Sequence, residues 1–403
     1  MSFRSFLAPV RPLRLLLVAV VSSVAACSDS TGPSDRPTFE PAAGVRWNAL
    51  ARDLVIKYRT DPVMASRTYA LLSVAQDRAV TTVLSRASAS PRPLDHASVV
   101  SASAVILSAA YPQETAMLDS VARGDLADPL WSADAPVSVS EGEAIGRAAA
   151  QQLLTERASD NASASWTGAI PTGPGMWYSS ASPPVPPLRP MWRSVSPWLM
   201  TRGDQFRPEP PPAFGSAEFQ AALTEVRRYS DQRTQRELDI AKHWGDGVGT
   251  YTPAGHWNRI AADLTTWYNL SEAETARVLA AMNMAMMDAG IAVWDAKYTY
   301  WLIRPSQADA AITTPVGLPN FPSYVSGHSG FSGAGADVLA FFFPNEAVRL
   351  RAQAEEAAMS RLYGGIHYRF DSEVGLRMGR AIAALAIARE RQRGTVAFTN
   401  RFN

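Results

Sequence analysis

The longest helical pattern in the chain, from about Glu272 to Leu302, narrows the possible folds more than any other feature. It begins at Ser271-Glu272-Ala273-Glu274, which has the form of a capping box. It ends ahead of Pro305, because the residue before a proline avoids the helical conformation. The methionines within it are typical of core packing rather than of a metal site. The fold class then depends on what packs around this helix.

Helical spacing of apolar residues recurs through most of the remaining chain. No stretch shows the sustained alternation expected of strands, and Gly333-Ala334-Gly335 follows no strand, so it is not a dinucleotide-binding fingerprint. The sequence therefore predicts an all-α protein. Helices are expected at about 45–58, 66–84, 98–110, 140–157, 219–236, 235–244, 260–270, 329–342, 346–362 and 372–391.

A proline- and tryptophan-rich segment interrupts the helices between residues 160 and 215. It contains a dozen of the 29 prolines, which excludes long helices and central strands. Its four tryptophans argue against disorder, because such side chains need burial. We interpret 160–215 as a long ordered irregular segment between an N-terminal helical layer (44–159) and a C-terminal helical domain (216–395).

The N-terminus has the features of an export signal. Residues 1–27 combine arginines, a short apolar run and Val24-Ala25-Ala26-Cys27, which resembles a bacterial lipoprotein signal with a lipidated cysteine. A plain secretory signal with a chance cysteine is the alternative. Cys27 is the only cysteine, so disulfides and thiol catalysis are not expected. Residues 28–43 are predicted to be a flexible tether to the periplasmic face of an outer membrane or to the cell surface.

The formal net charge of +1 provides no basic surface for nucleic acid. The chemistry is expected in three clusters instead. Lys297 and Arg304 stand seven residues apart, about two helical turns, so they are expected to share one helix face, and two cations so placed favour an anion between them. Both could also be solvated surface charges.

The second and third clusters lie at helix ends. Ser326-Gly327-His328 precedes a helical run, where free N–H groups and the helix dipole favour an oxyanion. Arg361 closes a helix that Gly364-Gly365 breaks, and His367 follows in a turn. Asp371, four residues later, can orient the ring of His367, cap the next helix, or do both.

Together the three clusters resemble one superfamily, that of type-2 phosphatidic acid phosphatases and vanadium-dependent haloperoxidases. Its pattern is Lys, six residues, Arg-Pro; then Pro-Ser-Gly-His; then Ser-Arg, five residues, His, three residues, Asp. Only Val325 departs, where the pattern has proline. The resemblance implies an oxyanion held by six residues of this chain: Lys297, Arg304, Ser326, Gly327, Arg361 and His367.

The wider match favours the haloperoxidase branch. Trp294-Asp295-Ala296-Lys297 resembles the Trp-x-x-Lys of those enzymes, and Phe321 lies in a similar lead into Ser-Gly-His. By the same resemblance Asp246 is expected to hold Arg361. The branch implies two packed helical bundles, and no helix here is expected to be long and apolar enough to span a membrane, unlike in the membrane-embedded lipid phosphatases.

In the haloperoxidase branch, the resemblance implies vanadate as cofactor, with hydrogen peroxide, halide and a small organic acceptor as partners. His367 would ligate vanadium axially, His328 would act as acid–base, and Lys297 would polarise the peroxide. In a phosphatase, His367 would instead form a phosphohistidine. A non-catalytic oxyanion-binding lipoprotein is the third alternative. The sequence does not distinguish the halide.

Overall fold

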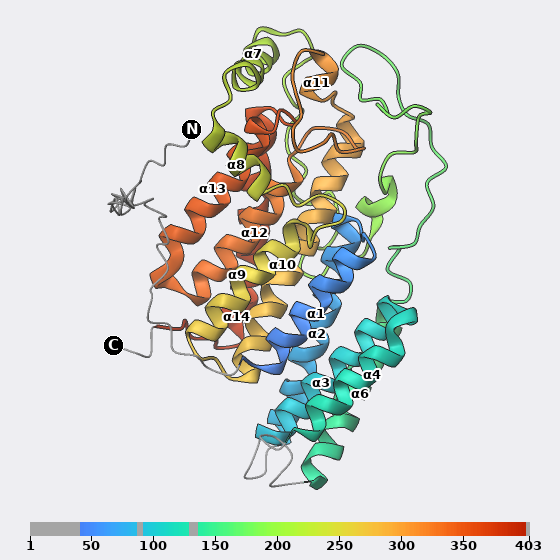
Figure 1. Cartoon of the computed structure of the whole chain (residues 1–403), viewed down its shortest axis with the longest axis vertical. Helices are drawn as coiled ribbons and strands as arrows, with labels where there is room; N and C mark the ends of the chain where they lie inside the picture. The colour runs from blue at the N-terminus through green and yellow to red at the C-terminus, as the bar shows by residue number, and fades with distance from the viewer. Residues whose placement is uncertain (1–40, 87–91, 129–135, 400–403) are drawn as a thin grey trace, which may run out of the picture. The chain divides into compact units, whose positions relative to one another are not determined.

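Helix α10 (Glu272–Tyr300) packs between the N-terminal and C-terminal helices of the computed structural model, which describes residues 41–86, 92–128 and 136–399 (Figure 1). The predicted capping box is confirmed: Ser271 Oγ accepts from the Glu274 N–H, and the Ser271 N–H donates to the Glu274 carboxylate. The helix ends at Tyr300, two residues earlier than expected, because Trp301 adopts a left-handed conformation with φ of 49°. The chain therefore changes direction just after Lys297.

The N-terminal helices pack on one side of α10. They are α1 (Ala43–Lys57), α2 (Pro62–Ser85), α3 (Arg92–Ala110), α4 (Thr115–Ala127) and α6 (Pro136–Glu156). Helix α3 packs against α6 and α2, and α2 lies along α10. Helix α4 was not predicted, because its 13 residues place only Leu118 and Ala122 in the core. His96, which precedes the helix expected at 98–110, is buried on α3, since that helix starts earlier, with Pro93 in its first turn, where proline is tolerated.

The C-terminal helices form the second group. They are α7 (Ala217–Gln232), α8 (Gln235–His243), α9 (Thr252–Trp267), α11 (Pro305–Ala308), α12 (Gly327–Phe342), α13 (Ala347–Tyr363) and α14 (Arg369–Gln392). Helix α12 packs against α14, α13 and α10. A Cβ atom at Gly379 of α14 would lie only 2.2 Å from the Gly330 carbonyl oxygen of α12, so the two backbones meet directly. Residues 252–258, which precede the helix expected at 260–270, form the first turns of α9.

The segment from 160 to 215 runs beside α10, in green in Figure 1, and is regular only at η2 (Pro190–Ser194). Trp177 and Trp192 are buried. Backbone bonds join it to the turn after α10, from the Trp177 N–H to the Trp301 carbonyl (2.7 Å) and from the Ile303 N–H to the Gly175 carbonyl (2.9 Å). Arg207 also donates twice to Asp295 of α10, at 2.6 and 2.8 Å. The segment thus braces the end of α10.

The all-α prediction is confirmed: where the structure is described, it contains helices and only isolated β-bridges. Helix α10 is long and apolar enough to cross a membrane, contrary to expectation, but 94% of its apolar window is buried, as in the core helix of a globular protein. The described residues all belong to one compact unit, Phe39–Asn403. The expected boundaries at 44, 160, 216 and 395 stay predictions. The signal, Cys27 and most of the tether lie outside the described residues.

Candidate active site

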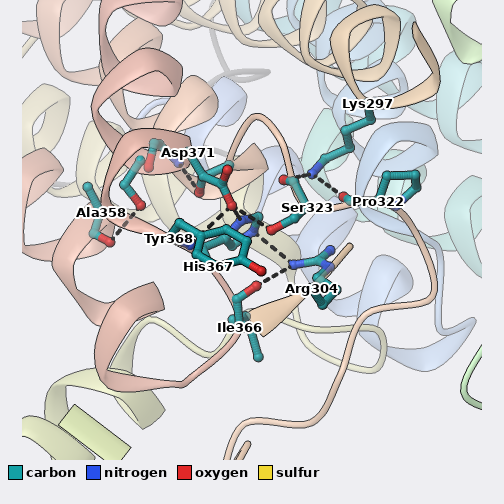
Figure 2. Close-up of polar contacts among 12 residues, drawn as sticks. Lys297, Arg304, Pro322, Ser323, Ala358, Ile366, His367, Tyr368 and Asp371 are labelled. Atoms are coloured by element: carbon teal, nitrogen blue, oxygen red, sulfur yellow. Dashed lines mark hydrogen bonds and ion pairs between the residues drawn. The ribbon is translucent and has the colours of Figure 1, made fainter. Parts of the chain in front are cut away.

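Four segments bring the predicted site residues together: the end of α10, the turn after it, the start of α12, and the connection from α13 to α14. Figure 2 shows Lys297, Arg304, His367 and Asp371 converging from three of them. Lys297, Arg304 and Arg361 are at most 1% exposed, and His367 is 2% exposed. The alternative that Lys297 and Arg304 are solvated surface charges is therefore wrong.

Lys297 and Arg304 lie close together, but not through the shared helix face that was expected. They do not share a helix face, because α10 ends at Tyr300 and Arg304 precedes α11. Instead both cations lie over the ring of Phe321, each 4.9 Å from its centroid. Lys297 Nζ donates to the carbonyls of Pro322 and Ser323, both at 2.8 Å. An ammonium has three donors, so one N–H of Lys297 remains for a ligand.

The contacts of Arg304 determine the tautomer of His367. Arg304 Nε donates to the Phe321 carbonyl at 2.9 Å, and Nη1 donates to the Ile366 carbonyl at 2.8 Å. Nη1 also lies 3.1 Å from His367 Nε2. A guanidinium only donates, so Nε2 must present its lone pair and the ring proton must sit on Nδ1. His367 is thereby prepared to act through Nε2 as a ligand or a nucleophile.

Asp371 both orients His367 and caps α14. Its Oδ2 lies 2.8 Å from His367 Nδ1, which carries the proton in this tautomer. The same oxygen accepts from the Ser323 hydroxyl at 2.5 Å and from the Tyr368 N–H at 3.2 Å. Ser323 was not singled out in the sequence, since its contact spans 48 residues. The two roles considered for Asp371 are thus combined.

The expected pairing of Asp246 with Arg361 is not observed. Arg361 Nη2 donates to the backbone carbonyls of Ala241 (3.1 Å) and Trp244 (2.5 Å), and its Nε donates to Ser360 Oγ (2.8 Å). Asp246 pairs with His256 Nδ1 at 3.0 Å instead. The end of α8 turns so that its carbonyls, not the Asp246 carboxylate, meet the guanidinium. The negative charge of Asp246 still raises the pKa of Arg361, which burial lowers to about 10.

Ser326-Gly327-His328 forms the start of α12. Ser326 is the N-cap, and its Oγ accepts from the Ser329 N–H at 3.3 Å, which leaves the hydroxyl proton to donate elsewhere. Gly327 occupies the first helical position, where the backbone N–H has no partner within the helix. Nε2 of His328 is buried and, among the residues described, bonds to none. These are features of an anion site at a helix N-terminus.

The electrostatics of the site favour an anion. Burial lowers the pKa of Lys297 well below its usual range, with Arg304 adding to the effect. Burial likewise lowers the pKa of Arg304 to about 10 and lowers those of His328 and His367 well below their ordinary values. Nη2 of Arg304 is buried and has no bonding partner in the described chain. Buried cations that still have an N–H donor without a partner are suited to bind a tetrahedral oxyanion.

Of the two aromatic residues suggested by the wider resemblance, Phe321 lies against both cations and Trp294 packs on Phe321. The rings of Trp294 and Phe321 are 5.1 Å apart between centroids. Val325, the departure from the family pattern, is fully buried and displaces no candidate ligand. His256 stacks on Trp244, with 4.2 Å between ring centroids, and pairs with Asp246. No local pattern in the sequence indicates that contact.

Comparison with known proteins agrees with this geometry. Residues 277–394 match the PAP2 superfamily. A bacterial vanadium-dependent iodoperoxidase is similar in structure, with a TM-score of 0.74 and 26% identity over 88% of this chain and 98% of that one. Two bacterial vanadium-dependent chloroperoxidase structures share the fold. The apo-type structure has a TM-score of 0.67 and 12% identity, and the match covers 82% of this chain and 95% of that one. The holo-type structure has a TM-score of 0.65 and 14% identity, and the match covers 83% of this chain and 93% of that one.

No curated protein gives a sequence match to the chain. The superfamily match contains every candidate ligand from Lys297 to His367, and the structural match to the iodoperoxidase extends through the N-terminal helices. The individual roles of the site residues stay predictions. Residues 277–394 therefore form a domain of the PAP2 superfamily, in a chain with the all-α fold of the vanadium-dependent haloperoxidases.

Proposed function

We propose that the protein is a vanadate-dependent haloperoxidase. The superfamily and its structural relatives support a haloperoxidase- or phosphatase-type enzyme. One observation favours the first: the chain matches 98% of the length of a bacterial vanadium-dependent iodoperoxidase at 26% identity. Iodide is for this reason the first halide to test.

The residues present fit vanadate. Lys297, Arg304 and Arg361 would neutralise its oxygens, and Ser326 and the Gly327 N–H would complete the cradle. His367 would supply its Nε2 lone pair, which already points toward Arg304. When bound, vanadate would supply a Lewis acid that activates hydrogen peroxide toward halide.

The protein's own groups would orient the reactants and move the protons. Asp371 holds the proton on His367 Nδ1 and so keeps Nε2 available. His328, neutral because its pKa is lowered, can accept a proton from hydrogen peroxide at Nε2 and return it to the departing oxygen. Lys297 is fully buried, with the ring of Phe321 over its ammonium and Trp294 packed on that ring. A shielded site strengthens every charge interaction within it.

A halide-oxidation assay tests the proposal. Purified protein is incubated with orthovanadate, hydrogen peroxide and iodide, and triiodide is followed by absorbance; bromide is tested in parallel with a phenol as acceptor. We expect vanadate-dependent turnover that His367→Ala abolishes. Asp288→Asn serves as the control: Asp288 is a buried aspartate of α10 whose carboxylate, within the described structure, accepts hydrogen bonds from the backbone of residues 198–200.

The phosphatase alternative uses the same His367 Nε2 as a nucleophile and keeps support from the superfamily match. Hydrolysis of 4-nitrophenyl phosphate that orthovanadate inhibits, with no halide oxidation, would establish it and overturn the haloperoxidase proposal. Binding of orthovanadate with neither activity would indicate a non-catalytic oxyanion-binding protein. Assays of halide oxidation, phosphate-ester hydrolysis and orthovanadate binding on one preparation distinguish the three functions.

Export and lipid anchoring are also part of the proposal, and they rest on residues 1–27 of the sequence. We expect Cys27 to become the lipidated N-terminus and to hold the protein at a bacterial membrane surface. Cys27→Ser should release the protein from the membrane fraction and prevent incorporation of labelled palmitate. Retention of the variant in the membrane would exclude this anchor.

A further inference from the structure

The buried pair of His256 and Asp246 takes no part in the chemistry proposed above. His256 Nδ1 lies 3.0 Å from Asp246 Oδ2, and both residues are buried. A carboxylate only accepts hydrogen bonds, so the ring proton of His256 sits on Nδ1. His256 therefore donates one directional hydrogen bond to Asp246.

This hydrogen bond restrains the turn that follows α8. Asp246 lies in the turn with φ of 41°, a left-handed conformation that residues other than glycine adopt rarely and keep only where their surroundings determine it. His256, in the first turns of α9, bonds the Asp246 side chain and stacks on Trp244, the C-cap residue of α8. One imidazole ring therefore contacts both ends of Trp244-Gly245-Asp246.

The end of α8 also supplies the acceptors that orient Arg361. The carbonyls of Ala241 and Trp244 accept from Arg361 Nη2 at 3.1 and 2.5 Å. Carbonyls at the C-terminal end of a helix lack partners within the helix and carry partial negative charge, so they suit a guanidinium. Arg361 Nε donates to Ser360 Oγ. Nη1 bonds to no group among the described residues, so its two N–H groups stay available to an oxyanion.

Asp246 is the nearby group that could compete for those donors. Burial lowers the pKa of Arg361 to about 10, and the charge of Asp246 opposes this shift, so the carboxylate acts on the guanidinium without bonding to it. A carboxylate that pairs directly with a guanidinium occupies two of its N–H groups. The hydrogen bond from His256 holds the Asp246 carboxylate in a different pairing and so leaves the Arg361 donors free.

We propose that His256 is a positioning residue of the oxyanion site. Its bond to Asp246 fixes the turn whose carbonyls orient Arg361, and it keeps the Asp246 carboxylate from pairing with the guanidinium. The bond has a larger effect than the stacking on Trp244, because only the bond restrains a charged group. The inference rests on the oxyanion binding that the proposed function requires. It applies to vanadate and phosphate alike, because Arg361 would bind the oxygens of either.

Two substitutions of His256 separate the hydrogen bond from the stacking. His256→Phe keeps a flat ring against Trp244 and removes the donor to Asp246. His256→Asn loses the ring, but its amide N–H lies near the position of Nδ1 and can still donate to Asp246. Isothermal titration of orthovanadate into the full chain, without peroxide or halide, measures the effect. The dissociation constant should rise about tenfold in His256→Phe and stay close to the wild-type value in His256→Asn.

His243→Phe is the matched control, because the ring of His243 meets those of Trp244 and His256 edge-on while Asp246 bonds to His256. It should bind orthovanadate as the wild type does. Circular dichroism verifies folding, and His256→Leu replaces His256→Phe if that variant does not fold. The proposal is overturned if the variant without a donor binds as the wild type does, or if His256→Asn loses as much affinity. A wild type that binds no orthovanadate would remove the proposed function as well.

Discussion

Replacing Asp371 by asparagine removes one buried negative charge beside His367 while keeping the shape of the side chain. The amide oxygen can take the place of Oδ2 and accept from His367 Nδ1, Ser323 and the Tyr368 N–H. The amide NH₂ can occupy the position of Oδ1, which has no partner in the described structure. Asp371→Asn therefore tests the effect of the negative charge, because the hydrogen bonds to His367, Ser323 and Tyr368 can be kept.

The expected loss follows from the strength of the bond to His367. A hydrogen bond to a charged group contributes about 1.5–3 kcal/mol, against about 0.5–1.5 kcal/mol for a neutral one. With the carboxylate gone, Nε2 of His367 becomes less basic and a weaker ligand. Loss of such a partner typically reduces affinity about 10- to 100-fold, or about 1.4–2.7 kcal/mol. We expect the dissociation constant for orthovanadate to rise by this factor in Asp371→Asn.

Isothermal titration of orthovanadate into wild type and Asp371→Asn measures this change. The control is Asp288→Asn, because Asp288 is also fully buried and also accepts three hydrogen bonds, but from the backbone of residues 198–200. Asp288→Asn should bind orthovanadate as the wild type does. Equal binding by Asp371→Asn and the wild type would refute the argument that Asp371 tunes His367.

Three further outcomes follow from the structure. Burial raises the pKa of Asp371 from 3.8 to about 6, so between these pH values the folded state holds a proton that the unfolded state has lost. The contribution of Asp371 to stability should therefore fall by roughly 3 kcal/mol as pH rises from below 3.8 to above 6, measured by urea unfolding as the difference between wild type and Asp371→Asn. His328→Ala should lower kcat for iodide oxidation about 10²- to 10⁴-fold with little change in orthovanadate affinity, and equal losses in both would indicate a ligand role. Arg207→Ala leaves the Asp295 carboxylate buried without its bidentate partner; because Arg207 is 37% exposed, we expect only about 1–2 kcal/mol of destabilisation, seen as a lower Tm that Arg207→Lys partly restores.

The sequence predicted the helices and the site residues because both signals are local. Apolar spacing identifies a helix within one or two turns, and the capping box at Ser271 is complete within four residues. Ser326 likewise caps α12 through a contact with Ser329, only three residues away. Helix α4 was missed because little of it is buried.

The sequence by itself identified the candidate site residues, because its three short motifs resemble those of one superfamily in residue type and spacing. Only the tertiary structure decided how they meet. Arg304 reaches Lys297 across the ring of Phe321, since the chain leaves the helix at Trp301, and Asp246 pairs with His256 while backbone carbonyls hold Arg361. Such contacts join residues 10 to 120 positions apart, and the direction of the chain between them depends on packing that no local pattern records.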